Sequence, residues 1–167
     1  MIVTVWRHGE AGQAFNDRRR ELTERGTDDI GFACQQFHRA CEARQLPHPQ
    51  LILHSPWVRT TQTAEILDAA FTHAALRAHP ALQPGAGTPQ VDTLLEQFLL
   101  APQCPEHLVL VSHQPLVSRL VDHYLGERGR VPALSPGGLA VLTLEAATAG
   151  GAGLLFWALP PEYEAGI

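Results

Sequence analysis

The sequence has 167 residues, of which 45% are apolar and 17% charged, which excludes a disordered chain and fits one globular domain spanning residues 1–167. Its net charge of −5 argues against a nucleic-acid-binding protein, because such proteins usually carry a basic surface. No apolar run approaches the roughly 20 residues of a membrane-spanning helix, and no basic-then-apolar signal segment opens the sequence. We therefore expect a cytoplasmic protein that does not bind membranes.

The first predicted element is a buried strand over residues 2–6, which are apolar and rich in β-branched side chains. It passes directly into Arg7, His8 and Gly9. Gly9 permits a sharp turn or a close backbone approach. Since α/β proteins present reactive groups at the carboxyl edge of their strands, we predict that His8 is a nucleophile toward phosphorus.

A polar segment follows, Ala11–Glu21, and we predict a loop beside the site. Its basic triplet, Arg18–Arg20, fits either a solvated surface run or a ligand contact, and Asn16 fits a turn. Thr23 is then a plausible N-cap. The helix it opens should end before Pro47, and its apolar residues recur at helical spacing: Ile30, Ala33, Cys34, Phe37, Ala40 and Cys41.

The three cysteines show no paired C-x-x-C spacing. Cys34 and Cys41 lie seven positions apart on one face of this helix, and Cys104 is left over. Buried thiols are therefore expected, and neither a disulfide nor a zinc site.

A second buried strand is predicted at Leu51–His54, followed by a helix with Ser55 as N-cap and Pro56 as the first helical residue. Arg59 then falls in the first or second turn. A cation there opposes the helix dipole unless it faces an anion, and this favours a ligand-binding role for Arg59 over a surface role.

Residues 79–89 read as a loop or a very short strand, and an amphipathic helix follows at Val91–Leu99. The third strong strand, Leu108–Val111, again stops on a histidine, His113, before a helix at Leu116–Tyr124. That helix should end at Gly126, and strands at Leu139–Leu144 and Leu154–Leu159 should close the domain as a hairpin around Gly150-Gly151.

This alternation of strands and helices predicts a three-layer α/β/α sandwich with a central, mostly parallel sheet. In such a sheet the carboxyl ends of the three strongly apolar strands, at residues 2–6, 51–54 and 108–111, converge. We therefore expect Arg7, His8, Arg59 and His113 to share one crevice.

Three motifs in this order resemble the histidine phosphatase superfamily, the phosphoglycerate mutase-like proteins with an RHG motif. They are Arg7-His8-Gly9, then Ser55-Pro56 with Arg59 and Gln62–Glu65, and finally Ser112-His113. Within the superfamily the chain most resembles the small SixA-type phosphohistidine phosphatases, through its compact length, Arg20-Glu21-Leu22-Thr23 and Ser112–Pro115.

The resemblance implies that His8 accepts the phosphoryl group, that Arg7, Arg59 and His113 complete the catalytic phosphate pocket, and that Arg20 adds a further phosphate contact. These residue types suit the chemistry. Neighbouring guanidinium groups keep a histidine neutral, as attack on phosphorus requires, and they stabilise the charge of the transition state. Neither a metal ion nor a cofactor is expected.

The chain departs from larger family members between Ala78 and Val91, where they carry a helical cap with a proton-donating carboxylate. Here the stretch is short and contains no Asp or Glu. The imidazole of a phosphohistidine can leave as a neutral group once it is protonated, so the missing acid affects it less than it affects a phosphate ester. Asp92 and Glu10 are candidate donors, but both also fit structural roles near helix starts.

We therefore expect a phosphatase for a phosphohistidine-bearing protein, such as a histidine-containing phosphotransfer domain in signal transduction. The alternatives are a small-molecule phosphomonoesterase, a mutase, and a non-catalytic phosphate-binding module. A mutase needs a closed cap, and a binding module needs the cations but not the nucleophile. We expect a monomer, and surface or packing roles for the remaining histidines.

Overall fold

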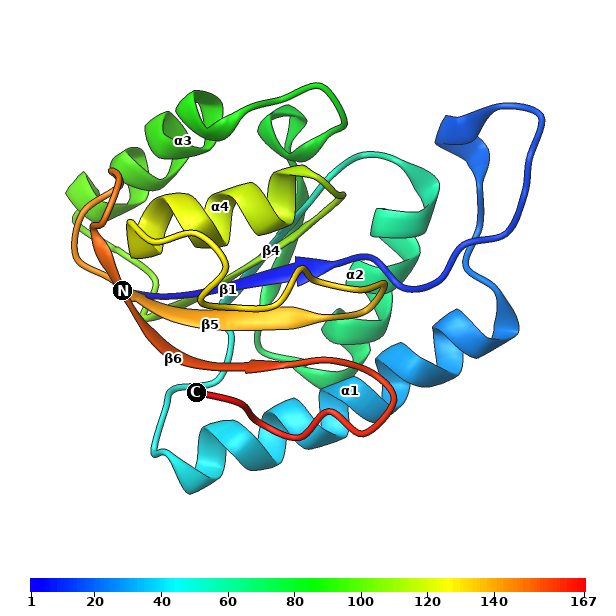
Figure 1. Cartoon of the computed structure of the whole chain (residues 1–167), viewed down its shortest axis with the longest axis horizontal. Coiled ribbons are helices and arrows are strands. Elements are labelled where there is room, and N and C mark those ends of the chain that lie inside the picture. Colours follow the sequence, from blue (N-terminus) through cyan, green and yellow to red (C-terminus); the bar gives the residue numbers. More distant parts are fainter.

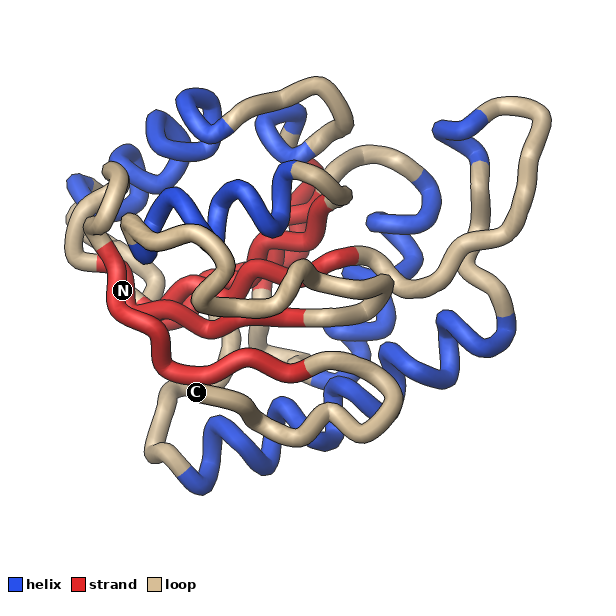
Figure 2. The backbone as a smooth tube through the Cα atoms, in the orientation of Figure 1, coloured by secondary structure: helices blue, strands red, loops and turns tan.

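The computed structural model describes all residues, 1–167, and is built on a six-stranded sheet (Figures 1 and 2). The strands follow the order β3-β2-β4-β1-β5-β6 across the sheet. They are β1 (Ile2–Arg7), β2 (Leu51–His54), β3 (Ala75–Ala78), β4 (His107–Ser112), β5 (Leu139–Leu144) and β6 (Ala152–Ala158). Strands β1 to β4 pair in parallel, whereas β5 and β6 are antiparallel. The prediction of a mostly parallel sheet with a closing hairpin is confirmed.

Four α-helices cover the two faces of this sheet: α1 (Glu24–Ala43), α2 (Val58–Ala70), α3 (Thr88–Leu100) and α4 (Leu116–Leu125). Residues of α1 and α2 pack into the core on one face, and residues of α3 and α4 pack on the other. Figure 1 shows α3 and α4 on the opposite side of the sheet from α1. Two short 3-10 turns, Asp17–Arg19 (η1) and Pro80–Leu82 (η2), complete the elements. The chain therefore forms the predicted three-layer sandwich.

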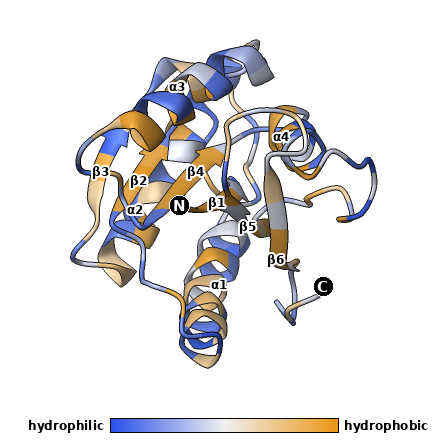
Figure 3. Ribbon diagram, turned by 90° about the vertical axis from the view of Figure 1, so that its left-hand side faces the viewer, coloured by the Kyte–Doolittle hydropathy of each residue, from blue (hydrophilic) through white to orange (hydrophobic).

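Strand β1 shows how the sequence produces two cores. Its alternate residues Val3 and Val5 pack toward α3 and α4, while Trp6 packs toward α1 and α2. The Trp6 ring lies 5.3 Å from that of Phe37 of α1, centroid to centroid, in an edge-on contact. The burial of each such side chain stabilises the folded state by about 1.5–3 kcal/mol. Apolar residues accordingly concentrate on the strands and the inner helix faces (Figure 3).

Two predicted helix signals are confirmed, the N-cap of α1 and the glycine that ends α4. The Thr23 side chain accepts a hydrogen bond from the backbone N–H of Gly26, which caps α1. Gly126 follows α4 with a φ of 67°, the left-handed conformation in which glycine is least strained.

No helix combines the length and the apolar character needed to cross a membrane. Cys34 and Cys41 are buried free thiols, and burial raises the pKa of each to about 12.

The structure corrects the predicted start of helix α2. Helix α2 begins at Val58, after Trp57, and not at Ser55-Pro56. The reason is that the backbone N–H of Ser55 donates to Val111 in β4 (3.0 Å), so Ser55 continues the sheet edge instead of turning into the helix.

Strand β3 has no counterpart among the sequence predictions, and β6 begins two residues earlier than predicted. Strand β3 is a short edge strand with mostly exposed side chains. It therefore lacks the apolar pattern by which a buried strand is found. The segment that follows it, predicted as a loop or a very short strand, contains only the turn η2.

Candidate active site

The candidate site lies where β1, β2 and β4 end at one edge of the sheet. The register of β1 and β4 pairs Arg7 with Ser112, and the backbone N–H of His8 donates to the Ser112 carbonyl (3.1 Å). His8 and His113 are thereby neighbours, with ring centroids 5.2 Å apart. The sheet topology thus brings together two histidines that are distant in sequence.

Gly9 allows this strand end to pack tightly against α1. A Cβ atom at Gly9 would lie 3.0 Å from the Gly26 carbonyl, and one at Gly26 would collide with the backbone of Glu10. Both glycines are therefore required by a close approach of two backbone segments, as the sequence suggested for Gly9.

His8 is held as a neutral imidazole with a defined tautomer. Its Nδ1 lies 2.7 Å from the carbonyl oxygen of Gly9, which can only accept a hydrogen bond, so Nδ1 carries the proton and Nε2 a lone pair. Burial is the main cause that lowers the pKa of His8 to about 4, and the charges of Arg59, Arg7 and Arg20 lower it further against the raising effect of the Gly9 bond. His8 is therefore uncharged at neutral pH.

Arg59 points its guanidinium at this lone pair. Its Nε donates to Nε2 of His8 at 3.1 Å, and its side chain is buried. The guanidinium carbon lies 5.0 Å from the ring centre of Trp57, in a cation–π contact that helps to hold it. Arg59 sits in the first turn of α2, so the predicted conflict with the helix dipole is real, and an anion in the site would relieve it.

Arg7 and His113 also belong to the candidate site, and each has one buried ring or guanidinium nitrogen without a hydrogen-bond partner. Arg7 donates from Nη1 to the Leu134 carbonyl (2.9 Å), and its Nε is buried without a partner. His113 is bonded through Nε2 to the hydroxyl of Ser55 (2.8 Å), while its Nδ1 is buried without a partner. Burial, together with His8 and Arg59, lowers the pKa of His113 to about 3.

Two buried nitrogens without partners are costly in a folded protein. When the Ser55 hydroxyl donates to Nε2 of His113, Nδ1 of that ring carries a proton and can donate. Arg7 Nε and His113 Nδ1 are then two buried donors without partners, on the residue that precedes His8 and on the histidine whose ring neighbours it. This arrangement suits an anion with several acceptor oxygens, such as a phosphoryl group.

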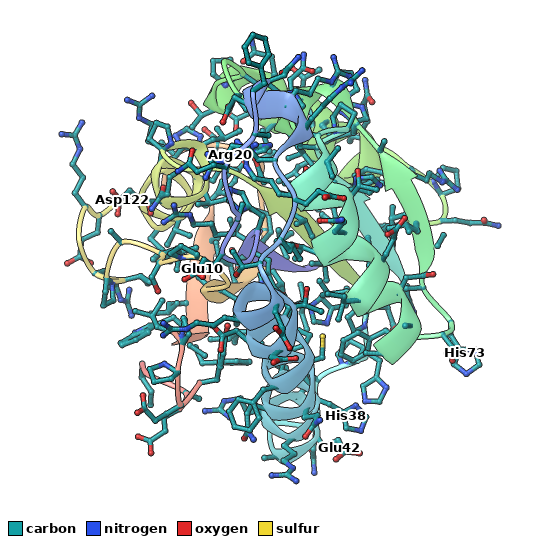
Figure 4. The ribbon with its side chains drawn as sticks, turned by 90° about the vertical axis from the view of Figure 1, so that its right-hand side faces the viewer. Glu10, Arg20, His38, Glu42, His73 and Asp122 are labelled. Carbon is teal, nitrogen blue, oxygen red and sulfur yellow. The ribbon has the colours of Figure 1, made fainter.

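The structure places Arg20 differently from the other predicted residues. Its Nε donates to the Gly12 carbonyl (2.8 Å) and its Nη1 binds the Asp17 carboxylate (3.1 Å), so it contacts neither His8 nor Arg59. Arg20 lies on the loop between β1 and α1, above Glu10 in the view of Figure 4.

Asp17 is the site residue that the sequence reasoning missed. Its carboxylate lies 3.5 Å from Nη2 of Arg59, and its backbone carbonyl accepts from Nη1 of Arg59 at 2.8 Å. The hydrogen bond from Arg20, followed by the charges of Arg59 and Arg20, lowers the pKa of Asp17. The sequence signal that could have identified Asp17 is its position as a single acidic residue directly before Arg18–Arg20.

The two candidate proton donors take structural roles instead. Glu10 accepts from the Thr23 hydroxyl (2.9 Å) at the start of α1. Asp92 of α3 accepts from the Tyr124 hydroxyl (2.8 Å) and binds His123, near the carboxyl end of α4, whereas the candidate site lies at the amino end of that helix. Likewise, the Asn16 side chain accepts from the backbone of Arg18, as expected of a turn.

No protein-family model and no curated protein matches this sequence. Among solved structures, the histidine phosphatase SixA complexed with tungstate is similar, with a TM-score of 0.79, 24% identity, and 96% and 97% of the two chains covered. A mycobacterial glucosyl-3-phosphoglycerate phosphatase complexed with VO3 gives a TM-score of 0.70 at 15% identity, covering 95% and 99%. The phosphoglycerate mutase of Plasmodium falciparum has a TM-score of 0.62 at 18% identity, and the match covers 92% of this chain and 87% of the mutase chain. The chain therefore has the α/β fold of the phosphoglycerate mutase-like proteins.

Proposed function

We propose that this protein is a phosphatase in which Nε2 of His8 accepts the phosphoryl group. The observation that carries the proposal is the state of that nitrogen. The Gly9 carbonyl fixes the proton on Nδ1 and burial keeps the ring neutral, so an available lone pair faces a group of cations. A nucleophile and the positive charge for its transition state are then supplied by side chains alone.

The first half of the reaction transfers the phosphoryl group to the protein. The substrate phosphoryl group binds to Arg7, Arg59 and His113, and the guanidinium of Arg59 turns from Nε2 of His8 to a phosphoryl oxygen. Nε2 attacks phosphorus in line, the bond from phosphorus to the leaving atom breaks, and that atom takes up a proton from solvent water. In the second half, water attacks the phosphorus of the phosphohistidine and the bond from phosphorus to Nε2 breaks. Inorganic phosphate and neutral His8 are then regenerated, and the surplus proton of the water returns to solvent.

We propose a phosphohistidine on another protein as the substrate, such as a histidine-containing phosphotransfer domain. Asp17 is the one carboxylate that contacts Arg59, and its lowered pKa leaves it ionised at neutral pH, so it is a poor proton donor. The segment between β3 and α3 adds no acid either, since it contains no Asp or Glu. A leaving imidazole is the group that tolerates such a site best.

A small-molecule phosphomonoesterase is the second candidate function. It is favoured by the fold shared with a phosphatase named for glucosyl-3-phosphoglycerate, since one fold supports several substrates. The two candidates differ in how much acid catalysis the substrate requires.

The deciding experiment compares three substrates: a histidine-phosphorylated phosphotransfer protein, phosphoramidate, and p-nitrophenyl phosphate. We expect the highest kcat/KM on the phosphoprotein and no change with EDTA. Efficient turnover of the ester alone would contradict the phosphohistidine proposal, and loss of activity with EDTA would contradict the metal-independent mechanism. Rapid quenching in an alkaline denaturant, in which the phosphorus–nitrogen bond survives, should trap phosphate on the wild-type protein and none on His8→Ala.

A further inference from the structure

A second histidine cluster lies at the other end of α1. His38, Glu42 and His48 each offer a ligating atom, and these atoms all lie within 4.8 Å of one another. Figure 4 shows His38 and Glu42 near the carboxyl end of α1, far from the loop that carries Arg20. His38 is twelve residues beyond Gly26, the contact point of the candidate active site, which is about 18 Å along a helix. The cluster is thus separate from the phosphate pocket.

The sequence predicts surface or packing roles for these histidines, because they are scattered along the chain without ligand spacing. Two structural features bring the three side chains together. His38 and Glu42 lie one turn apart on α1, with His38 Nε2 3.2 Å from Glu42 Oε1. The chain then reverses after α1, so that the ring of His48 lies 4.6 Å from that of His38, centroid to centroid.

The backbone that carries His48 is held in place. It runs between Pro47 and Pro49, and the Pro47 carbonyl is bonded to Nδ1 of the buried His107 (2.7 Å). Proline restricts the backbone of its own and of the preceding residue. The ring of Phe71 packs against both His38 and His48, with centroids 6.3 Å and 6.2 Å away. His48 therefore faces the helix without a large cost in backbone ordering.

We propose that His38, Glu42 and His48 form a binding site for a divalent transition metal ion, best Zn²⁺. Two imidazoles and one carboxylate form a ligand set that suits this ion, with water in the fourth position. Ligand atoms around tetrahedral zinc are about 3.4 Å apart. The His38–Glu42 pair already meets this spacing, and the exposed side chain of His48 needs only a small rotation.

The ion would join the end of α1 to the segment that enters β2, and so would stabilise the fold. It would take no part in phosphoryl transfer, given its distance from His8. Binding of a ligand to the folded state alone raises the melting temperature with ligand concentration. Because the ligating imidazoles must be neutral, binding also releases protons and weakens as the pH falls.

The test is a calorimetric titration of the metal-free, EDTA-dialysed protein with Zn²⁺ at neutral pH. We expect one ion per chain, and at least tenfold weaker binding in His48→Ala and in Glu42→Gln. His73→Ala is the matched control, since His73 lines the same shallow hollow beside Phe71 but lies outside the ligand group (Figure 4). His8→Ala controls for zinc bound at the phosphate pocket.

Spectroscopy with Co²⁺ provides an independent readout. We expect visible absorption bands typical of a tetrahedral site in the wild type and in His73→Ala, and their loss in His48→Ala. Equal zinc affinity of His48→Ala and wild type would overturn the proposal. Loss of the one-to-one binding in His8→Ala would do so as well, because it would place the ion at the other cluster.

Discussion

The two histidine clusters of this protein use the same ring in opposite surroundings. His8 and His113 are buried among arginines, whereas His38 and His48 are more exposed and have a carboxylate as their neighbour. Cations repel a metal ion and attract a phosphate, and a carboxylate does the reverse. The charge of the neighbours, and not the histidine itself, therefore decides which ligand each cluster suits.

Burial adds a second difference. At the sheet edge it lowers the pKa values of His8 and His113 to about 4 and about 3, so both rings are neutral over a wide range of pH. The Gly9 carbonyl also fixes the tautomer of His8, and the Ser55 hydroxyl holds the ring of His113 in place. A nucleophile needs this fixed geometry, while exposed metal ligands can adjust by rotation.

The largest expected effect is that of His8→Ala. We predict a loss of turnover of at least about 10³-fold with the fold intact, because the attacking nitrogen is removed. Steady-state kinetics with p-nitrophenyl phosphate or phosphoramidate, together with circular dichroism, would measure both. His73→Ala, at an exposed position outside both histidine clusters, is the matched control and should retain wild-type activity. Near-normal turnover by His8→Ala would show that His8 is not the nucleophile.

Arg59→Lys should lower kcat/KM by about 10²- to 10³-fold, the usual cost of losing one well-placed donor to transition-state charge. Lysine keeps the positive charge but cannot bond both to His8 and to the Asp17 carbonyl, as the guanidinium does. The comparison between Arg59→Lys and Arg59→Ala separates charge from geometry. Full activity in Arg59→Lys would mean that charge alone suffices.

Stability should fall as the pH drops from about 6.5 to about 4. An unfolded histidine takes up a proton near pH 6.5, whereas burial holds the pKa values of His8 and His107 at about 4. The unfolded state therefore binds more protons in this window, and stability present above pH 6.5 is lost as the pH falls. Each unit of pKa difference corresponds to about 1.4 kcal/mol, so we expect a loss of several kcal/mol.

Urea denaturation at pH 7 and pH 5 would measure this loss. His107→Gln should reduce the pH dependence, because it removes one of the buried rings whose pKa is lowered. His73→Gln, at an exposed position outside both clusters, should leave the difference in the free energy of unfolding between pH 7 and pH 5 unchanged. A stability that is flat between pH 7 and pH 5 would contradict the neutral, buried state of His8.

The layers of the fold and the meeting of His8, Arg59 and His113 followed from local sequence patterns. Apolar strands that stop on polar residues identified the right sheet edge, and parallel pairing brought the ends together. What the sequence could not reveal depended on tertiary contacts. Ser55 reads locally as a helix cap, but it is held by β4 and His113, and so α2 starts later.

The same limit applies to Asp17 and to the metal-ligand cluster. Asp17 lies in a polar loop without periodicity, and its contact with Arg59 spans 42 positions of the chain. The spacing of His38 and Glu42 was visible on the helix, but the path of the chain to His48 was not. Side-chain partners across loops are set by the fold and leave little mark on the local pattern.

Asp17→Asn should have the smallest effect, and it tests whether a carboxylate competes with the substrate for Arg59. Asp17 is an exposed anion held on the cation that we propose for phosphate, so the two should exclude each other. Exposed ion pairs contribute about 0.2–1 kcal/mol, and we therefore predict about two- to fivefold tighter inhibition by tungstate or phosphate. Glu21→Gln is the matched control, since this carboxylate of the same loop contacts Gln62 and no arginine. Weaker inhibition in Asp17→Asn would mean instead that Asp17 positions Arg59 for the anion, because its removal would then disorder the guanidinium.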